Sequence, residues 1–504
     1  MSDSSRFETA PEDRIPVYQK VIYGLGALGN QMLPAAIGCM AIVLNLGLGM
    51  NPALIGTILA IPRFFDAIID PIMGFLTDHT KSKWGRRKPY IFVGALLSGL
   101  TFALMWQLPA GHNQHFYVLF FTIGSIVFYG AYTVFAAPFV ALGYEMTPDY
   151  HERTSLMGYA NSIGTLTWII APWFWYIMAN KAWFSDSVQG ARTLAIAVGI
   201  FFAIVGILPA IFVKERFYDI AKAEDEKGSP SKYPLQEILG KFSGFFRGIF
   251  ITFRNVEFIK LCAATFFVFN GFMMISGLGS YVIIYYVFGG LNQDIAVNST
   301  NWLSKWIPTL SSGAFIGLFG SISALATALL VTPIITAISR KVGKRNAFFI
   351  AMVIAILGYF VKWFCYKPGS PWLILWAAPL VAFALGSLFI LVPSMMADVC
   401  DMDELANGQR REGMFGAVYW WMVKMGMAVA LFLSGHLLNM TGFNVGLGNF
   451  QPMKSLYLMR VYEIGFSVVT LVIAIFSVAT YKITEAKARE VRVELEKRRG
   501  KAAA

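Results

Sequence analysis

Three ionisable side chains interrupt one of the most apolar stretches of this chain. Arg63, Asp66 and Asp70 lie in the run IPRFFDAIIDPIMGF, residues 61–75. Their spacing of three and four residues places them on one face of a helix. At the centre of a membrane-spanning helix, a single Asp or Arg costs roughly 2.5–3.5 kcal/mol on insertion scales, so three unpaired charges would oppose insertion. We therefore expect these groups to face one another or a polar cavity, as in an ion or solute pathway.

The composition of the whole chain indicates a membrane protein. Of its 504 residues, 57% are hydrophobic and 14% are charged, and the mean hydropathy is +0.59. Such values are far from those of soluble globular domains. Since about 20 apolar residues span a bilayer as a helix, the sequence predicts an all-α membrane protein with twelve transmembrane helices. The twelve segments are residues 20–46, 52–77, 90–108, 116–143, 155–179, 192–213, 256–288, 309–338, 346–366, 371–397, 413–440 and 457–481.

Basic residues are concentrated in loops on one side of these segments. They follow the second segment at Lys81, Lys83, Arg86, Arg87 and Lys88, and the eighth at Arg340, Lys341, Lys344 and Arg345. Because cytoplasmic loops retain Lys and Arg, we expect both termini in the cytoplasm and the protein in the plasma membrane. The formal net charge of +12 then belongs to loops and tails beside an anionic lipid surface, so no nucleic acid partner is expected. We expect a monomer.

The two halves of the sequence resemble each other. A charged stretch at 214–255 separates the segments at 20–213 from those at 256–481, with polar tails at 1–19 and 482–504. The second and eighth segments both end in a basic turn, with Gly85 and Gly343 respectively. Such repetition is typical of transporters built from duplicated helical bundles. The sequence therefore predicts two six-helix bundles joined by a cytoplasmic linker.

Charged residues near the predicted cytoplasmic ends of the segments form a candidate gate. Charge contacts among them could hold one conformation closed, although retention of topology and helix capping explain them equally well. The candidates are Asp78, Arg86, Arg87, Glu145, Arg153, Asp398, Asp401 and Arg411. Two further charges within apolar segments, Lys362 and Glu463, are expected to extend toward the membrane surface.

A family resemblance rests on several of these residues. The string FDAIIDPIMGFLTDHTKSKWGRRKPY, with YGLGALGN in the first segment and Lys424 in the eleventh, resembles the glycoside-pentoside-hexuronide cation symporters. These form the melibiose permease group of the major facilitator superfamily, and the similarity extends over nearly the whole chain. The resemblance implies the superfamily fold and symport of a sugar or glycoside with Na⁺ or H⁺, without a further cofactor.

The resemblance also implies a cation site. In that family the paired carboxylates of the second helix bind the coupling cation, which corresponds to Asp66 and Asp70 here, and Thr133 matches a cation-site hydroxyl. Two carboxylates one turn apart repel each other in a low dielectric, so a bound proton or Na⁺ would relieve them. Ile69 stands where the family has a side-chain amide, which leaves Na⁺ and H⁺ as alternatives. Arg63 and Lys424 could compensate the carboxylates when no cation is bound, or form structural salt bridges.

The solute site departs from the melibiose-type pattern. Gln31 and Ala136 stand at positions where those relatives have sugar-binding carboxylates. Remaining candidates for contact with the solute are Asn30, Gln31, Tyr129, Tyr132, Asn161, Asn270 and Trp420, and packing or interhelical hydrogen bonds are the alternative for each. A non-sugar amphipathic or acidic solute is therefore a second hypothesis. An enzyme is not expected, because no nucleophile with a base and no metal cluster is apparent within the segments.

Overall fold

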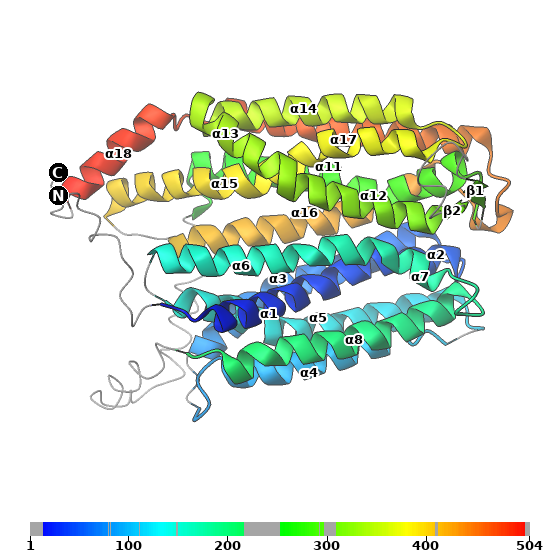
Figure 1. The fold of residues 1–504 in the computed structure, drawn as a ribbon, viewed down its shortest axis with the longest axis horizontal. Coiled ribbons are helices and arrows are strands. Elements are labelled where there is room, and N and C mark those ends of the chain that lie inside the picture. Colours follow the sequence, from blue (N-terminus) through cyan, green and yellow to red (C-terminus); the bar gives the residue numbers. More distant parts are fainter. Residues whose placement is uncertain are drawn as a thin grey trace. The chain divides into compact units, whose positions relative to one another are not determined.

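The computed structural model describes residues 14–78, 80, 82–109, 111–147, 150–215, 252–291, 293–296, 309–408 and 412–498 (Figure 1). The fold is nearly all-helical, as predicted from the apolar segments. The chain divides into two compact units, and each is described by itself. Unit 1 comprises residues 1–50 and 61–234, and unit 2 comprises residues 51–60 and 235–504.

Unit 1 contains the first set of helices. In chain order they are α1 (Val17–Met40), α2 (Ile42–Leu46), the larger part of α3 (Pro52–Asp78), α4 (Lys88–Met105), α5 (Gln114–Glu145), α6 (Tyr150–Ile170), a 3₁₀ turn (Ala171–Trp173), α7 (Phe174–Met178) and α8 (Ser187–Phe212). Helix α1 packs against α6 and α8, and α4 packs against α5 and α8. The close contact between α4 and α8 requires glycine at residue 99, because a Cβ there would lie 2.4 Å from the carbonyl oxygen of Gly199 on α8.

Substitution of Gly99 by Ala is expected to destabilise unit 1, because the added methyl group would push α4 away from α8. Overpacking of this kind costs about 1–3 kcal/mol. Gly130→Ala in α5 is the matched control, since a Cβ there has no heavy atom within 4 Å. In thermal unfolding in detergent, Gly99→Ala should melt below the wild-type protein and Gly130→Ala should not. Equal melting temperatures for the two variants would contradict the close contact between α4 and α8.

Unit 2 repeats this packing with a second set of elements. Its helices are α11 (Val256–Met274), α12 (Ser312–Ala326), α13 (Thr332–Val342), α14 (Lys344–Cys365), α15 (Ala378–Asn407), α16 (Glu412–Met440), α17 (Met453–Ala479) and α18 (Glu485–Arg498). Shorter helical turns are η4 (Ile275–Gly279), η5 (Val282–Val287), η7 (Thr327–Val331), η8 (Pro371–Trp376) and η9 (Val445–Leu447). Helix α11 packs against α16 and α17, and α14 packs against α15 and α17. In unit 1 the equivalent contacts are those of α1 with α6 and α8, and of α4 with α5 and α8.

A short pair of strands lies outside the helical pattern. Strand β1 (Asp294–Ala296) runs antiparallel to β2 (Thr309–Ser311), with Asp294 opposite Ser311. The sequence predicted a loop before residue 309 and a helix from there. The helix begins instead at Ser312, where the hydroxyl of Ser311 accepts a hydrogen bond from the backbone of Ala314 at 3.1 Å.

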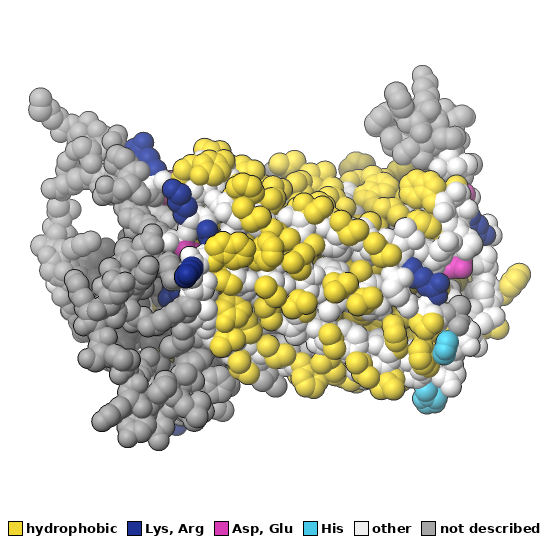
Figure 2. All heavy atoms as spheres, turned by 90° about the horizontal axis from the view of Figure 1, so that it is seen from below, with side chains coloured by type: hydrophobic (Ala, Val, Ile, Leu, Met, Phe, Trp, Pro, Cys, Tyr) yellow, Lys and Arg dark blue, Asp and Glu magenta, His cyan; other side chains and the backbone are white. Residues whose placement is uncertain are grey.

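The lengths and surface of the helices identify an integral membrane protein. Within the described residues, ten helical segments are long and apolar enough to cross a membrane. Helices α3 and α6 are not among the ten, and with them the count is consistent with the twelve predicted. Figure 2 shows one face of the molecule, where hydrophobic side chains cover the middle and Lys and Arg lie toward the ends. Such an apolar surface matches the hydrocarbon core of a bilayer.

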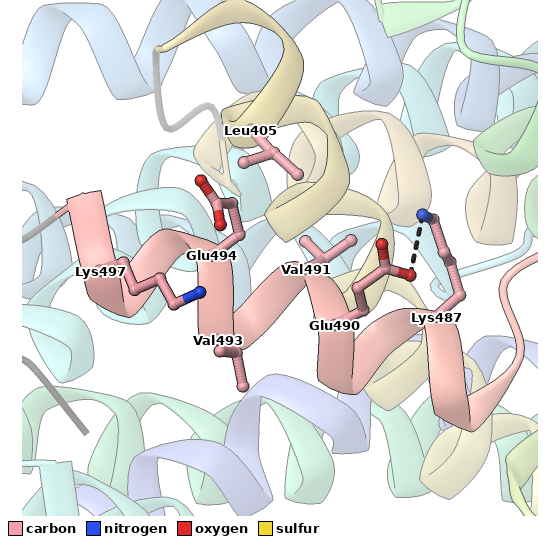
Figure 3. A pocket seen from close by; sticks show the side chains of 7 residues that line it. All are labelled: Leu405, Lys487, Glu490, Val491, Val493, Glu494 and Lys497. Atoms are coloured by element: carbon pink, nitrogen blue, oxygen red, sulfur yellow. Dashed lines mark hydrogen bonds and ion pairs between the residues drawn. The ribbon is translucent and has the colours of Figure 1, made fainter. Parts of the chain in front are cut away.

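The predicted linker and the charged tail differ in how much of each the structure describes. Most of the predicted linker, residues 216–251, lies outside the described residues. The charged tail contains α18, whose Val491 and Leu495 are buried. Helix α18 packs against α15, and Figure 3 shows Leu405 of α15 beside the side chains of α18, in a groove that contains none of the predicted site residues.

The expectation for Lys362 and Glu463 was wrong. Both side chains are 0% exposed, and the Lys362 Nζ lies 2.5 Å from the Glu463 Oε1. The hydroxyl of Tyr366 donates to the other carboxylate oxygen at 2.7 Å. Because the two charges neutralise each other inside unit 2, neither side chain has to reach the membrane surface.

Candidate functional site

A buried carboxylate lies at the centre of the candidate site in unit 1. Asp66, on α3, is 1% exposed, and Thr133, on α5, is 0% exposed. The Thr133 hydroxyl donates to the Asp66 Oδ1 at 2.8 Å. Hydrogen bonds to a charged acceptor are stronger than those between neutral groups. Two residues of the predicted cation site are therefore in direct contact.

Arg63 lies one turn before Asp66 and is also buried, at 4% exposure. Its guanidinium carbon lies 4.6 Å from the centre of the Tyr129 ring on α5. In a desolvated setting, such a cation–π contact is worth about 2 kcal/mol. Within the described part of the chain, the Arg63 Nε has no hydrogen-bond acceptor. The site thus holds a cation with unused donor capacity next to an aromatic ring.

Tyr132 links α5 to α1. Its hydroxyl donates to Asn30, at 2.6 Å from the backbone oxygen and 2.9 Å from Oδ1. Tyr129 and Thr133, which contact Arg63 and Asp66 of α3, lie within one turn of Tyr132 on α5. Asp70 is half-buried on α3, one turn after Asp66. The helices therefore gather the predicted carboxylates, the arginine and the tyrosines in one region of unit 1.

A second polar contact joins α1 to α6. The indole Nε1 of Trp168 donates to the Gln31 Oε1 at 2.9 Å. The Gln31 amide approaches α6 so closely that a Cβ on Gly164 would lie 2.4 Å from Nε2. Trp168 was not predicted, although it lies seven residues after Asn161 and therefore on the same helix face. Asn161 itself is exposed on α6.

The predicted site residues of unit 2 differ in exposure. Asn270 on α11 is 1% exposed, and its Nδ2 donates to the Phe266 backbone oxygen at 2.8 Å. Its Oδ1 has no hydrogen-bond donor among the described residues. On α16, Trp420 is 51% exposed and Lys424 is half-buried.

Three of the predicted gate residues of unit 1, Arg86, Arg87 and Glu145, form a charge cluster. Both Arg86 and Arg87 bind the Glu145 Oε1 through their Nη2 atoms, and the Arg87 contact measures 2.8 Å. Arg153 is exposed and donates to the Thr147 backbone oxygen at 3.1 Å. The Asp78 side chain lies outside the described part.

The predicted gate residues of unit 2 are less fully placed. Lys344 is the first residue of α14, and its Nζ binds the Asp398 Oδ2 at 2.7 Å. Lys344 was recognised only as a loop cation from the sequence. Asp401 is half-buried on α15, and Arg411 lies outside the described residues.

Comparisons with known proteins agree with this architecture. A family model described as "MFS/sugar transport protein" matches residues 22–302 and 309–485. An uncharacterized symporter of Synechocystis is 25% identical, with 95% of this chain and 96% of the relative covered. A lactose permease of Leuconostoc lactis is 26% identical over 96% of this chain and 72% of the relative. A sodium-dependent lysophosphatidylcholine symporter of Danio rerio is 23% identical over 94% and 89%.

A solved structure shows the same fold. A bacterial homologue of the human lysosomal transporter Spinster aligns with a TM-score of 0.62 at 14% identity, covering 96% of this chain and 98% of that chain. The helical fold and the family match define an integral membrane transporter of the major facilitator type, not an enzyme. Within that class, the chain belongs to the MFS/sugar transport family.

Proposed function

We propose that this protein is a cation-coupled symporter of a sugar or glycoside that works by alternating access. The main support for this proposal is that the Asp66 carboxylate is buried within a membrane protein and accepts a hydrogen bond from the Thr133 hydroxyl. An acidic group inside a membrane protein is by default a functional one, because its insertion is costly. Asp66, Asp70 and Thr133 form the proposed cation site.

The charges of this site provide a route to coupling. A proton or Na⁺ at Asp66 and Asp70 would change how strongly these carboxylates attract Arg63 and the hydroxyl of Tyr132. Solute and cation are then coupled if each binds more tightly to the conformation that the other favours. In this scheme Lys424 serves as a second compensating cation, and the gate residues hold the cytoplasmic side closed in one conformation. Both termini face the cytoplasm of the cell.

The polar and aromatic groups of the candidate site support a sugar or glycoside as the solute. Asn30, Gln31 and the two tyrosines offer amide and hydroxyl groups of the kind that bind sugar hydroxyls. Trp168 adds an indole ring whose Nε1 already bonds Gln31. Asn161, Asn270 and Trp420 complete the proposed solute contacts. The names of several relatives, among them the lactose permease, are consistent with this solute class.

A non-sugar solute with an acidic or amphipathic group is the second candidate. The buried Arg63, whose Nε has no acceptor among the described residues, would bind a carboxylate or phosphate well. The lysophosphatidylcholine symporter among the relatives shows that similar chains are named for such a solute. The two candidates differ in whether Arg63 contacts the solute directly.

Transport into proteoliposomes tests both candidates in one assay. The panel contains labelled monosaccharides, disaccharides, uronides and glycosides, with a labelled lysophospholipid as the amphipathic member, under an imposed Na⁺ or H⁺ gradient. We expect one sugar or glycoside to accumulate under one of the two gradients. Uptake of the lysophospholipid alone would favour the second candidate, and uptake of neither class under either gradient would contradict the proposal.

A further inference from the structure

Glu215 is a buried acidic residue that the proposed function does not use. It follows α8 and is the last described residue before the undescribed stretch 216–251. Although it begins a highly charged stretch of sequence, its exposure is only 9%. A buried carboxylate requires partners, and these lie in a turn more than a hundred residues earlier in the chain.

The partners of Glu215 are three consecutive backbone N–H groups at the start of α4. Arg86 donates to Oε2 at 2.8 Å, Arg87 to Oε1 at 2.8 Å, and Lys88 to Oε1 at 3.0 Å. The N-cap residue of α4, Arg87, makes no side-chain cap of its own. Glu215 therefore satisfies donors that a helix start leaves unpaired and places a negative charge at the positive end of the helix.

The absence of a side chain at Gly85 leaves space for the Glu215 carboxylate. Its φ of +108° lies in the region that favours glycine. A Cβ at this position would lie 2.3 Å from the Glu215 Oε2. A side chain at residue 85 would therefore strain the backbone of the turn and also collide with the Glu215 carboxylate.

The turn that Glu215 holds also carries the two arginines that bind Glu145. The backbone groups held by Glu215 belong to Arg86 and Arg87, whose side chains both bind Glu145 at the end of α5. One carboxylate thus holds the backbone of the turn while another holds its side chains. The segment leaving α8 is thereby connected through the turn to the end of α5.

We propose that Glu215 is a positioning residue of the transport cycle. It holds the turn at 85–88 so that Arg86 and Arg87 meet Glu145, and it ties the segment leaving α8 to that cluster. Movement of this segment would then be transmitted to the charge cluster during the change of conformation. The role in transport rests on the proposed function, whereas the positioning of the turn does not.

The equivalent turn of unit 2 provides a matched control. Gly343, with φ +80°, precedes α14 as Gly85 precedes α4. Glu485 approaches this turn after α17, but its Oε2 would lie 3.6 Å from a Cβ on Gly343. Its side chain is 55% exposed and pairs with Arg489 of its own helix. Replacing Glu485 should therefore leave the turn before α14 unchanged.

Hydrogen–deuterium exchange of the full-length protein in lipid nanodiscs tests the positioning role without a solute. In Glu215→Ala, the amides of Arg86, Arg87 and Lys88 should exchange at least about tenfold faster, as expected when charged hydrogen bonds are lost. Exchange at 142–147, the end of α5, should rise as well. Glu215→Gln should give a smaller increase, because its amide oxygen still accepts. Glu485→Ala should match the wild type at 343–346.

Gly85→Ala provides a second test if Glu215→Ala does not fold. Its methyl group would displace the Glu215 carboxylate, so exchange should rise at 86–88 and at 142–147, as in Glu215→Ala. Unchanged exchange at 86–88 in either folded variant, or a rise there without one at 142–147, would overturn the positioning role.

The transport role is tested separately. With any solute identified by the uptake panel, Glu215→Ala should lower the maximal rate at least about tenfold and leave the half-saturating concentration within about twofold. A normal transport rate despite faster amide exchange would mean that Glu215 only caps the start of α4. Failure of the panel to identify a solute would count against the proposed function and leave the exchange result to decide the positioning role.

Discussion

Replacement of Asp66 by Asn is expected to abolish uphill uptake while the protein still inserts and folds. Asn cannot bind a proton at physiological pH and carries no negative charge for Na⁺, but its volume and its hydrogen bond with Thr133 can be retained. Asp70→Asn should have the same effect. The measurement is gradient-driven accumulation in proteoliposomes, with equal protein incorporation confirmed for each variant. Uphill uptake by Asp66→Asn at the wild-type level would rule out the proposed cation site.

Thr133→Val refines this test by removing only the hydroxyl. Loss of a hydrogen bond to a charged group costs about 1.5–3 kcal/mol, so the cation concentration at half-maximal uptake should shift roughly 10- to 100-fold. The shift should be upward for Na⁺, which loses a possible oxygen ligand, and downward for H⁺, because the ionised carboxylate loses a donor. Thr167→Val is the matched control, because Thr167 is also 0% exposed in unit 1 but donates to the Leu28 backbone oxygen at 3.1 Å. It should keep the wild-type cation dependence. Equal shifts in the two variants would indicate general loosening of the bundle.

The largest effect on stability is expected at the buried pair of Lys362 and Glu463. Glu463→Gln leaves the Lys362 ammonium buried without its carboxylate, which should destabilise the protein by about 3–5 kcal/mol. Lys362→Met leaves the carboxylate unpaired and should cost a similar amount. The double variant has no unpaired charge, and its glutamine oxygen can still accept from the Tyr366 hydroxyl, so most of the lost stability should return.

Thermal unfolding of the purified variants in detergent measures this double-mutant cycle. Both single variants should melt well below the wild-type protein, and the double variant should melt above either of them. A double variant that is less stable than both single variants would contradict the account of the ion pair.

Local patterns in the sequence were sufficient to predict the helices and the face of α3 that carries the site. The period of 3.6 residues places Arg63, Asp66 and Asp70 together whatever the tertiary structure. Long apolar segments likewise predict spans, and most boundaries differ by a few residues. The segment predicted at 155–179 differs more, because α6 ends at Ile170 and a 3₁₀ turn and α7 follow it. The choice of Thr133 came from family resemblance, since nothing in its local sequence indicates a contact with Asp66.

Contacts between distant segments could not be predicted in this way. Lys362 and Glu463 are separated by 101 residues, and each alone resembles a charge that reaches the membrane surface. Glu215 resembles any acidic linker residue until the turn before α4 is placed against it. Gln31 and Trp168 meet because α1 packs on α6. In each case the partner is determined by helix packing, which the local pattern does not specify.

Coupled transport requires a cation gradient to drive the solute uphill, and the accumulation ratio tests this requirement most directly. Proteoliposomes with a labelled solute from the panel are followed under an imposed Na⁺ or H⁺ gradient, and an ionophore then dissipates that gradient. The internal solute concentration should rise above the external one and return to equality after the ionophore is added. A ratio that stays at one while the gradient is maintained, in vesicles that take up the solute, would contradict coupled transport.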